Sequence, residues 1–201
     1  MSIKAVFWDF SGVLITEKQG RGHAYFSQML GIPADVLKAY FFSEENHKKD
    51  LGEISYIDFY RLILHEQNKD EVLLSNISRA FEEAFELNQP MLEYIKELSK
   101  SVKIGLLSNY SDRLRPMLEK DLHIAHLFHD IVISSEVGMV KPDEQIYHTA
   151  LSRLNVFPHE AIFVDDRIEN IEGAARVGIH AIHFQNNEQT ISKIDQLIME
   201  N

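Results

Sequence analysis

The stretch Ala161–Ile182, AIFVDDRIENIEGAARVGIHAI, holds a complete strand–helix–strand pattern with an acidic pair near its start. Four apolar residues lead into Asp165 and Asp166, a helical pattern follows over Arg167–Val177, and a second strand pattern covers His180–Phe184. Short apolar runs without strict alternation are typical of strands that are covered on both faces of a sheet. The stretch therefore predicts a parallel sheet with helices packed on both sides.

The same alternation extends to the rest of the second half of the chain and to its first residues. Apolar runs predict further strands at Ile3–Asp9, Val102–Ser108 and Ile131–Ser134. Helical spacing predicts helices at Met91–Lys100, Asp112–Asp121, Asp143–Leu154 and Glu188–Met199. Repeated β–α–β units of this kind predict an α/β fold with a Rossmann-like, doubly wound parallel sheet.

Residues 16–89 have a different pattern, with no convincing strand. Apolar residues recur at helical spacing over Gly22–Leu30, Ala34–Ser43, Tyr56–His65 and Glu71–Phe85. We therefore expect a core domain made of residues 1–15 and 90–201, with a small all-helical cap domain, residues 16–89, inserted after the first strand. The loop Asp50–Ser55, which joins two of these helices, is a candidate for facing the site.

Composition narrows the class of function. The chain has 201 residues, a net charge of −11 and no cysteine. Such an acidic protein is poorly suited to the phosphate backbone of nucleic acid, and chemistry that needs a thiolate is excluded. We find no signal peptide and no apolar run long enough to cross a membrane, so we expect a cytoplasmic protein, either monomer or homodimer.

Polar side chains follow the predicted strands at the sheet edge where ligands bind in such folds. Asp9 ends the first strand, and the pair Asp165 and Asp166 ends the fourth. Three carboxylates at one edge repel one another unless a cation lies among them. Mg²⁺ is the natural cation because it takes oxygen ligands and bridges to phosphate oxygens. We therefore expect a magnesium site that accepts a small phosphorylated substrate.

Further residues fit the same task. Lys141 can offset the negative charge of the carboxylates and of the substrate. The Ser108 hydroxyl and the backbone N–H groups after it, beginning with Asn109, can donate to phosphate oxygens at a helix start. Gly12 lets the backbone turn tightly beside the ligand.

These residues resemble the four motifs of the haloacid dehalogenase-like (HAD) superfamily of hydrolases, in the right order and spacing. The matching phrases are IKAVFWDFSGVL, IGLLSNYSD, SSEVGMVKPDEQIYHTAL and AIFVDDRIENIEGAARVGIHAI. The resemblance implies that Asp9 is the nucleophile, Ser108 binds phosphate and Lys141 stabilises charge. It also implies that Asp165 and Asp166 bind the metal together with Asp9 and the backbone carbonyl of residue 11, with Asn170 where many members carry Asp.

Ser11 departs from that pattern. Phosphatases of the family carry Asp two residues after the nucleophile, where it protonates the leaving oxygen and later activates water. A serine hydroxyl titrates far above neutral pH and does this poorly. General acid–base help is typically worth about 10²–10⁴-fold in rate. The resemblance therefore implies an intact metal site and phosphoryl acceptor without the usual proton donor.

Three functions remain open at this point. The first is a phosphatase that uses activated substrates, such as acyl or aryl phosphates, or that recruits another proton donor. The second is a catalytically silent or slow protein that binds a phosphorylated ligand. The third is a phosphonatase-type hydrolase of a C–P bond, which would need a cap lysine for a Schiff base. Lys48 and Lys49 are the candidates for that lysine, although both resemble ordinary solvated residues.

Overall fold

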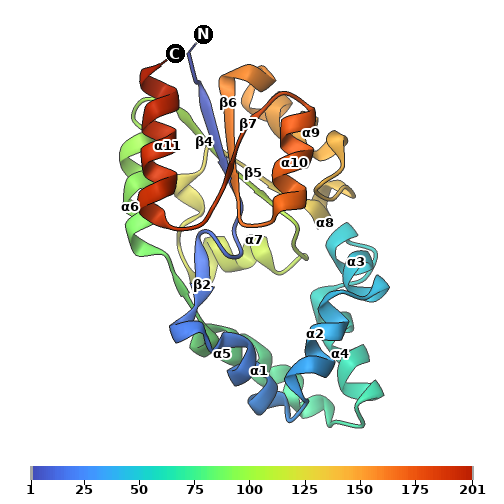
Figure 1. The fold of residues 1–201 in the computed structure, drawn as a ribbon. Helices are drawn as coiled ribbons and strands as arrows, with labels where there is room; N and C mark the ends of the chain where they lie inside the picture. Colours follow the sequence, from blue (N-terminus) through green and yellow to red (C-terminus); the bar gives the residue numbers. More distant parts are fainter. Residues whose placement is uncertain (1, 201) are drawn as a thin grey trace.

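A computed structural model describes residues 2–200, apart from the side chain of Ser78. Its centre is a five-stranded parallel sheet with the strand order β5-β4-β1-β6-β7 (Figure 1). The strands are β1 (Ala5–Trp8), β4 (Lys103–Ser108), β5 (Asp130–Ile133), β6 (Ala161–Asp165) and β7 (His180–His183). The predicted α/β class and parallel sheet are confirmed, and each predicted strand is present with ends shifted by no more than a few residues.

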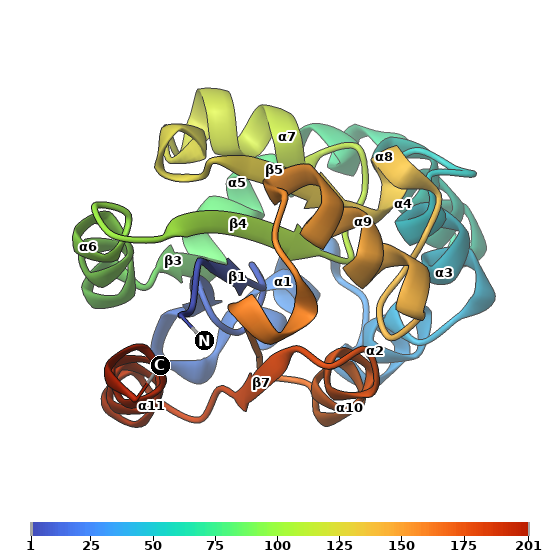
Figure 2. The ribbon, with the colours of Figure 1, turned by 90° about the horizontal axis from the view of Figure 1, so that it is seen from above.

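Helices cover both faces of the sheet, as the apolar runs predicted. Figure 2 shows α6 (Gln89–Leu98) and α11 (Asn187–Met199) on one side, and α9 (Glu144–Leu154) and α10 (Ile168–Arg176) on the other. Shorter elements connect them: α7 (Leu114–Pro116), a π-helical turn (Met117–Asp121), α8 (Ser134–Val137) and the 3₁₀ turns Ala125–Leu127 and Pro158–Glu160. The predicted helix Asp112–Asp121 is thus shorter and divided.

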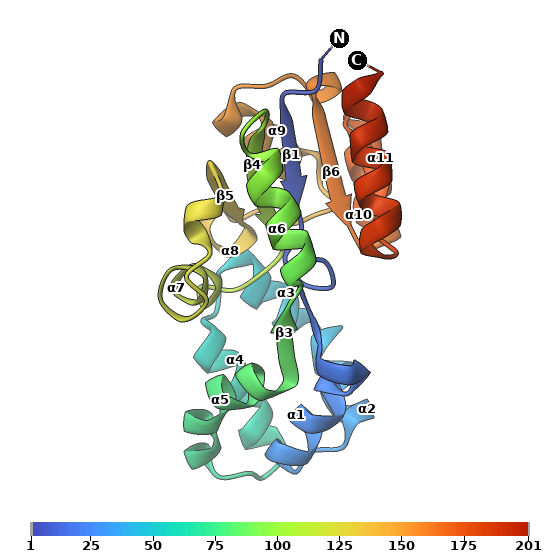
Figure 3. The same cartoon turned by 90° about the vertical axis from the view of Figure 1, so that its left-hand side faces the viewer.

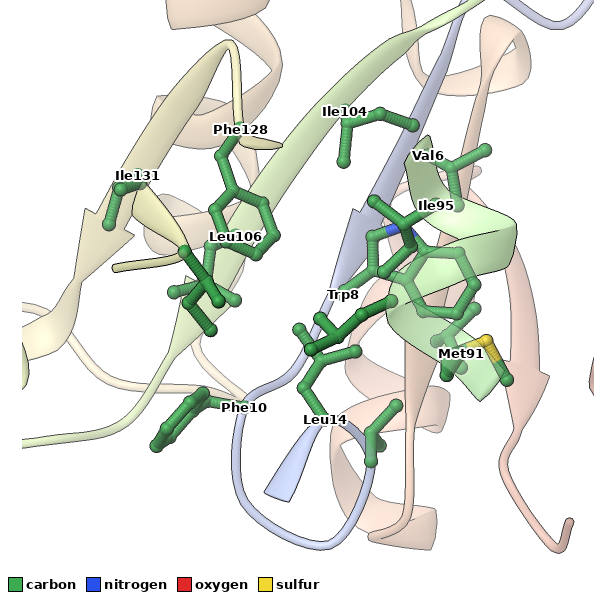
Figure 4. Close-up of a cluster of buried hydrophobic side chains, with 14 of the residues drawn as sticks. Val6, Trp8, Phe10, Leu14, Met91, Ile95, Ile104, Leu106, Phe128 and Ile131 are labelled. Atoms are coloured by element: carbon green, nitrogen blue, oxygen red, sulfur yellow. The ribbon is translucent and has the colours of Figure 1, made fainter. Parts of the chain in front are cut away.

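Alternate residues of each strand supply the two hydrophobic layers, because successive side chains point to opposite faces. Val6 and Trp8 pack with Leu106 and Ile95 on the α6 side (Figure 4), whereas Phe7 lies with the apolar residues of α9 on the other side. Trp8 is fully buried and meets the Tyr94 ring edge-on at 6.4 Å between ring centroids. The two layers hold β1 rigidly, and β1 ends one residue before Asp9.

The inserted segment, residues 15–87, begins and ends in a two-stranded antiparallel ribbon. Its strands are β2 (Ile15–Glu17) and β3 (Phe85–Leu87), with Ile15 opposite Leu87. The prediction that residues 16–89 contain no strand was therefore wrong. Each strand has three residues, and its partner lies far away in sequence, so no local sequence pattern indicates either strand. The division into two domains stays a prediction, although the ribbon lies at the predicted boundaries.

Between the two strands lie five helices and two 3₁₀ turns, which Figure 3 shows gathered beyond the end of the sheet opposite both chain termini. The helices are α1 (Gly22–Leu30), α2 (Ala34–Phe41), α3 (Glu44–Leu51), α4 (Tyr56–Glu66) and α5 (Leu74–Ala84). The 3₁₀ turns are Lys18–Gly20 and Glu71–Leu73. This bundle has its own buried cluster, which includes Phe59, Ile63 and Ile77. No helix in residues 2–200 is long and apolar enough to span a membrane.

Two contacts bring the inserted segment against the core. Gly52 ends α3 with a φ of +79°, and an added Cβ there would lie 2.3 Å from the Ser135 carbonyl oxygen of α8. The backbone N–H of Tyr56, at the start of α4, donates to the Asp112 carboxylate over 2.8 Å. The helices therefore lie over the carboxyl ends of the strands, with a cavity between the two.

Candidate active site

Asp9 lies at the centre of the site because β1 lies at the centre of the sheet. Trp8 is in register with Leu106 of β4 on one side and Val164 of β6 on the other, and the Asp9 N–H donates to the Val164 carbonyl over 2.9 Å. The chain crosses from one side of β1 to the other between β5 and β6, so this is the topological switch point where such sheets bind ligands.

The three predicted carboxylates come together. Asp9, Asp165 and Asp166 each offer an oxygen, and these oxygens all lie within 4.8 Å of one another. Burial raises the pKa of Asp9 to about 7, against the opposing effect of Lys141 and with added repulsion from Asp165 and Asp166. Burial and Asp165 likewise raise the pKa of Asp166. Such a cluster is short of positive charge, which fits a site for a divalent cation.

Lys141 supplies the one ammonium group among the described residues that contacts this cluster. Its Nζ lies 2.9 Å from Asp9 and 2.6 Å from Asp165, and it donates to the Leu107 carbonyl over 3.0 Å. Burial alone would lower the pKa of Lys141, but Asp9 and Asp165 outweigh burial and raise it. Its charge is therefore retained inside the protein, where it can meet a phosphoryl oxygen beside Asp9.

Ser108 and Gly12 leave room and hydrogen-bonding capacity for an anion. The buried Ser108 hydroxyl has no hydrogen-bond partner within residues 2–200, and a buried hydroxyl without a partner is costly. Gly12 has a φ of +78°, and an added Cβ would lie 2.2 Å from an Asp166 carboxylate oxygen. Its N–H donates to the Ile15 carbonyl, so Gly12 contributes space beside Asp166.

Two predicted site residues use their side-chain amides to hold their neighbours. Asn109 forms two hydrogen bonds with the Lys141 backbone, at 2.9 and 2.8 Å. The buried Asn170 amide donates to both oxygens of Asp165, at 3.1 and 3.0 Å. These contacts support positioning roles for both side chains. Phosphate binding by Asn109 and metal binding by Asn170 stay predictions.

Ser11 is exposed to a cavity of about 480 Å³ that runs from Asp9 into the inserted segment. The cavity is lined by the loops after the strands and by helices of the inserted segment, which supply Phe41, Phe59 and Tyr60 among others. A phosphoryl group occupies only a small part of this volume. The remainder can hold the rest of a small molecule.

The sequence indicates Lys49 as a candidate cap lysine and the loop beginning at Asp50 as a candidate for facing the site, but it does not indicate that the two side chains pair in the cavity wall. Lys49 was interpreted as a solvated lysine, but its side chain is only 13% exposed and pairs with Asp50 at 2.7 Å. Lys48, by contrast, is 39% exposed and pairs with Glu44. The caps of α3 could have indicated this helix, because Ser43 accepts from the Asn46 N–H and Gly52 adopts the left-handed conformation. Nothing in the sequence distinguishes the burial of the two lysines.

Comparison with known proteins identifies the family of the chain. The haloacid dehalogenase-like hydrolase family matches residues 3–178, which is most of the chain. The chain belongs to this family. A phosphorylated carbohydrates phosphatase from Thermotoga maritima is 26% identical over 199 residues, covering 90% of this chain and 84% of that protein. The chain spans less than half the length of the first curated relatives that it matches.

Solved structures of HAD-like proteins share the fold. A predicted HAD-like family hydrolase from Porphyromonas gingivalis has a TM-score of 0.84 at 22% identity, and the match covers 100% of both chains. A HAD family enzyme from Bacteroides thetaiotaomicron, in complex with magnesium and inorganic phosphate, has a TM-score of 0.75 at 21% identity, covering 92% of this chain and 95% of that chain. The predicted HAD-like architecture is thereby confirmed.

Proposed function

We propose that this HAD-like hydrolase is a magnesium-dependent phosphatase that acts on a small phosphate monoester through an aspartyl-phosphate at Asp9. The observation that carries the proposal is the floor of the cavity. There, Asp9 contacts Lys141 and lies within 4.8 Å of two further carboxylates. The neighbouring strand β4 ends at Ser108, whose hydroxyl has no partner among the described residues. A nucleophile, a cation, a hydroxyl donor and a metal-binding cluster are the groups that phosphoryl transfer needs.

In the proposed reaction, an Asp9 oxygen attacks phosphorus and the bond to the leaving oxygen breaks. Lys141 and Ser108 stabilise negative charge on the phosphoryl oxygens. Asp9 and Asp166, with the Ser11 carbonyl, would hold Mg²⁺, which when bound neutralises charge on those same oxygens. Water then attacks phosphorus, which releases inorganic phosphate and restores the Asp9 carboxylate. Asn109 and Asn170 keep Lys141 and Asp165 in place.

The third alternative, a phosphonatase that forms a Schiff base on a cap lysine, has less support. It needs a neutral, unpaired amine, whereas the Lys49 ammonium is paired with Asp50 at 2.7 Å. A silent ligand-binding protein remains the second candidate, because Ser11 offers no carboxyl group for proton transfer. The phosphatase and the silent binding protein would hold the same metal and phosphoryl group in the same place. A measurement of substrate turnover distinguishes the two functions.

Substitution of Ser11 tests the proposed function. The wild-type chain should hydrolyse 4-nitrophenyl phosphate with Mg²⁺ and lose this activity in EDTA. Ser11→Asp should raise kcat/KM for glycerol phosphate by about 10²-fold, since it restores a general acid for a basic leaving group. It should change kcat/KM for 4-nitrophenyl phosphate far less, because that leaving group needs no proton.

Ser11→Asn is the matched control, as it is similar in size to Asp but cannot donate a proton. A rise with Asn equal to that with Asp would contradict the missing-acid argument. If neither wild type nor Ser11→Asp turns over any phosphate ester, yet the protein binds beryllofluoride with Mg²⁺, the silent-binder function replaces the phosphatase.

Gly12→Ala should weaken magnesium binding by about 10-fold or more, measured by titration calorimetry. The added Cβ would lie 2.2 Å from the Asp166 carboxylate and displace it, and displaced groups around a metal site typically cost 10–100-fold in affinity. Gly20→Ala is the control, because Gly20 has a similar φ of +66° with no atom within 4 Å of an added Cβ. In both variants the side chain at a positive φ should itself cost about 1–2 kcal/mol of stability. Equal magnesium affinities in the two variants would contradict the assignment of Asp166.

A further inference from the structure

The cavity wall is rich in aromatic residues. It includes Phe41, Phe59 and Tyr60 of the inserted segment and Tyr110 of the core. Tyr56 and Tyr60 lie with their ring centroids 4.8 Å apart, and Phe59 and Tyr60 at 5.5 Å. Burial raises the pKa of Tyr56 to about 12, and burial also raises the pKa of Tyr60 and of Tyr110, so all three remain uncharged at neutral pH. Flat rings of this kind bind another flat ring well.

The lysine and arginine side chains that line the cavity are already paired. Within the described residues, the pairs are Lys141 with Asp9 and Asp165, Lys49 with Asp50, and Arg167 with Glu169. A second anionic group on the substrate, such as another phosphate or a carboxylate, would therefore meet only lysine and arginine side chains that already have a carboxylate beside them. It would also meet Asp50 or Glu17. The leaving group that fits this wall is uncharged.

Lys49 and Asp50 form a polar ion pair within the aromatic wall of the cavity. The Lys49 Nζ lies 5.5 Å from the Phe59 ring centroid and 5.7 Å from that of Tyr110, so it joins a ring of the inserted segment to a ring of the core. Asp50 is 16% exposed and also accepts from the Asn46 amide at 3.3 Å. This pair offers a donor and an acceptor side by side, which suits a neutral polar group such as a hydroxyl.

The missing acid at Ser11 restricts the leaving group independently. An alkyl alkoxide is too basic to depart without a proton, whereas a phenol has a pKa of about 10 and leaves as the phenolate. When the bond between phosphorus and the phenolic oxygen breaks, the electron pair stays on that oxygen, which later takes a proton from water. Charge pairing, aromatic lining and the residue at position 11 thus favour the same class of leaving group.

We propose that the substrate is the phosphate monoester of a phenol, whose ring lies against Tyr60 and Tyr110 and whose uncharged polar substituent hydrogen-bonds to Lys49 and Asp50. This inference rests on the proposed phosphatase function, which it makes more specific. Lys49 and Asp50 act as specificity-determining residues, because they contact the part of the substrate that does not react.

Four substrates test the inference: phenyl phosphate, 4-(hydroxymethyl)phenyl phosphate, 4-carboxyphenyl phosphate and glucose 6-phosphate. The hydroxymethyl compound should give the highest kcat/KM, the carboxyl compound a lower value than phenyl phosphate, and glucose 6-phosphate a value at least about 10²-fold below phenyl phosphate. Lys49→Met should lower kcat/KM for the hydroxymethyl compound about 10-fold more than for phenyl phosphate. The double variant Lys49→Met, Asp50→Asn should show the same larger loss of kcat/KM for the hydroxymethyl compound, without leaving the Asp50 carboxylate unpaired.

Lys48→Met is the matched control, because Lys48 pairs with Glu44 and does not line the cavity. A second readout needs no turnover: calorimetry should show that 4-hydroxybenzyl alcohol, the expected product, binds wild type and Lys48→Met alike and Lys49→Met at least several-fold more weakly. If glucose 6-phosphate is hydrolysed faster than every aryl phosphate, the inference is overturned while the phosphatase function stands. If no ester is hydrolysed but the alcohol binds as described, the phosphatase function fails and the pocket assignment stands. Equal binding by Lys48→Met and Lys49→Met overturns the assignment of Lys49.

Discussion

Asp9→Asn should reduce turnover of 4-nitrophenyl phosphate by about 10⁴-fold or more, since an amide cannot act as the nucleophile and losses of this size follow removal of a nucleophile. The stability of the folded protein should not fall. Burial, with added repulsion from Asp165 and Asp166, raises the pKa of the Asp9 carboxyl to about 7, so the variant removes a buried charge that is costly to maintain. Lys141 keeps Asp165 as a partner at 2.6 Å. We therefore expect a thermal midpoint equal to or above that of wild type, measured by differential scanning calorimetry.

Asp35→Asn provides the control, because Asp35 is an exposed residue of α2 outside the cavity. It should retain full activity. Mass spectrometry of the acid-quenched wild type should detect a phosphorylated protein that is absent from Asp9→Asn. Substantial residual turnover in Asp9→Asn would show that another group attacks phosphorus, and the proposed mechanism would have to be abandoned.

Lys141→Met should be the most destabilising change at the site and should also abolish activity. The Lys141 side chain is 1% exposed and ion-paired with two buried carboxylates. Breaking a buried pair by removing one partner typically costs about 3–5 kcal/mol, because the remaining charges stay buried without compensation. For a chain of this size, that corresponds to a fall in thermal midpoint of about 10 °C.

The double variant Lys141→Met, Asp9→Asn should recover part of the lost stability, since it removes one of the two stranded carboxylates. Lys48→Met should leave the midpoint within about 1 °C, as expected for an exposed ion pair of small net effect. A midpoint for Lys141→Met within about 2 °C of wild type would mean that Asp9 and Asp165 do not depend on this lysine for their charge balance.

The sheet could be predicted from sequence because its strands are buried on both faces. The runs ending at Asp9, Ser108 and Asp165 are apolar for this reason, and a shared sheet edge follows from parallel order alone. The ribbon of β2 and β3 could not be predicted, because its pairing depends on the folded position of residues far apart in sequence. Helix α3 contains no buried residue, so hydrophobic spacing gives no signal for it.

The site was predictable to the level of residue types but not of contacts. Chemistry identifies Asp9 and Lys141 as site residues, and the structure brings them within 2.9 Å. The same reasoning predicts direct ligand contacts for Asn109 and Asn170, which stay predictions, and it does not foresee that their amides contact Lys141 and Asp165. Side-chain amides serve equally well as ligands and as supports, and only the folded geometry distinguishes these uses. Lys49 illustrates the same limit, because its Nζ lies near the rings of Phe59 and Tyr110, which are distant from it in sequence.

The paired strands β2 and β3 carry an evolutionary consequence. The chain leaves the core at Leu14 and returns at Asn88, and these two residues are joined by a hydrogen bond of 2.9 Å between the Asn88 N–H and the Leu14 carbonyl. The chain therefore enters and leaves the inserted segment at one place, beside the β2–β3 ribbon. Under the proposed function, mutation or lengthening of residues 15–87 would change the part of the cavity that meets the leaving group. Asp9, Asp165, Asp166 and Lys141 lie outside that segment, so the groups proposed to break the bond would keep their places.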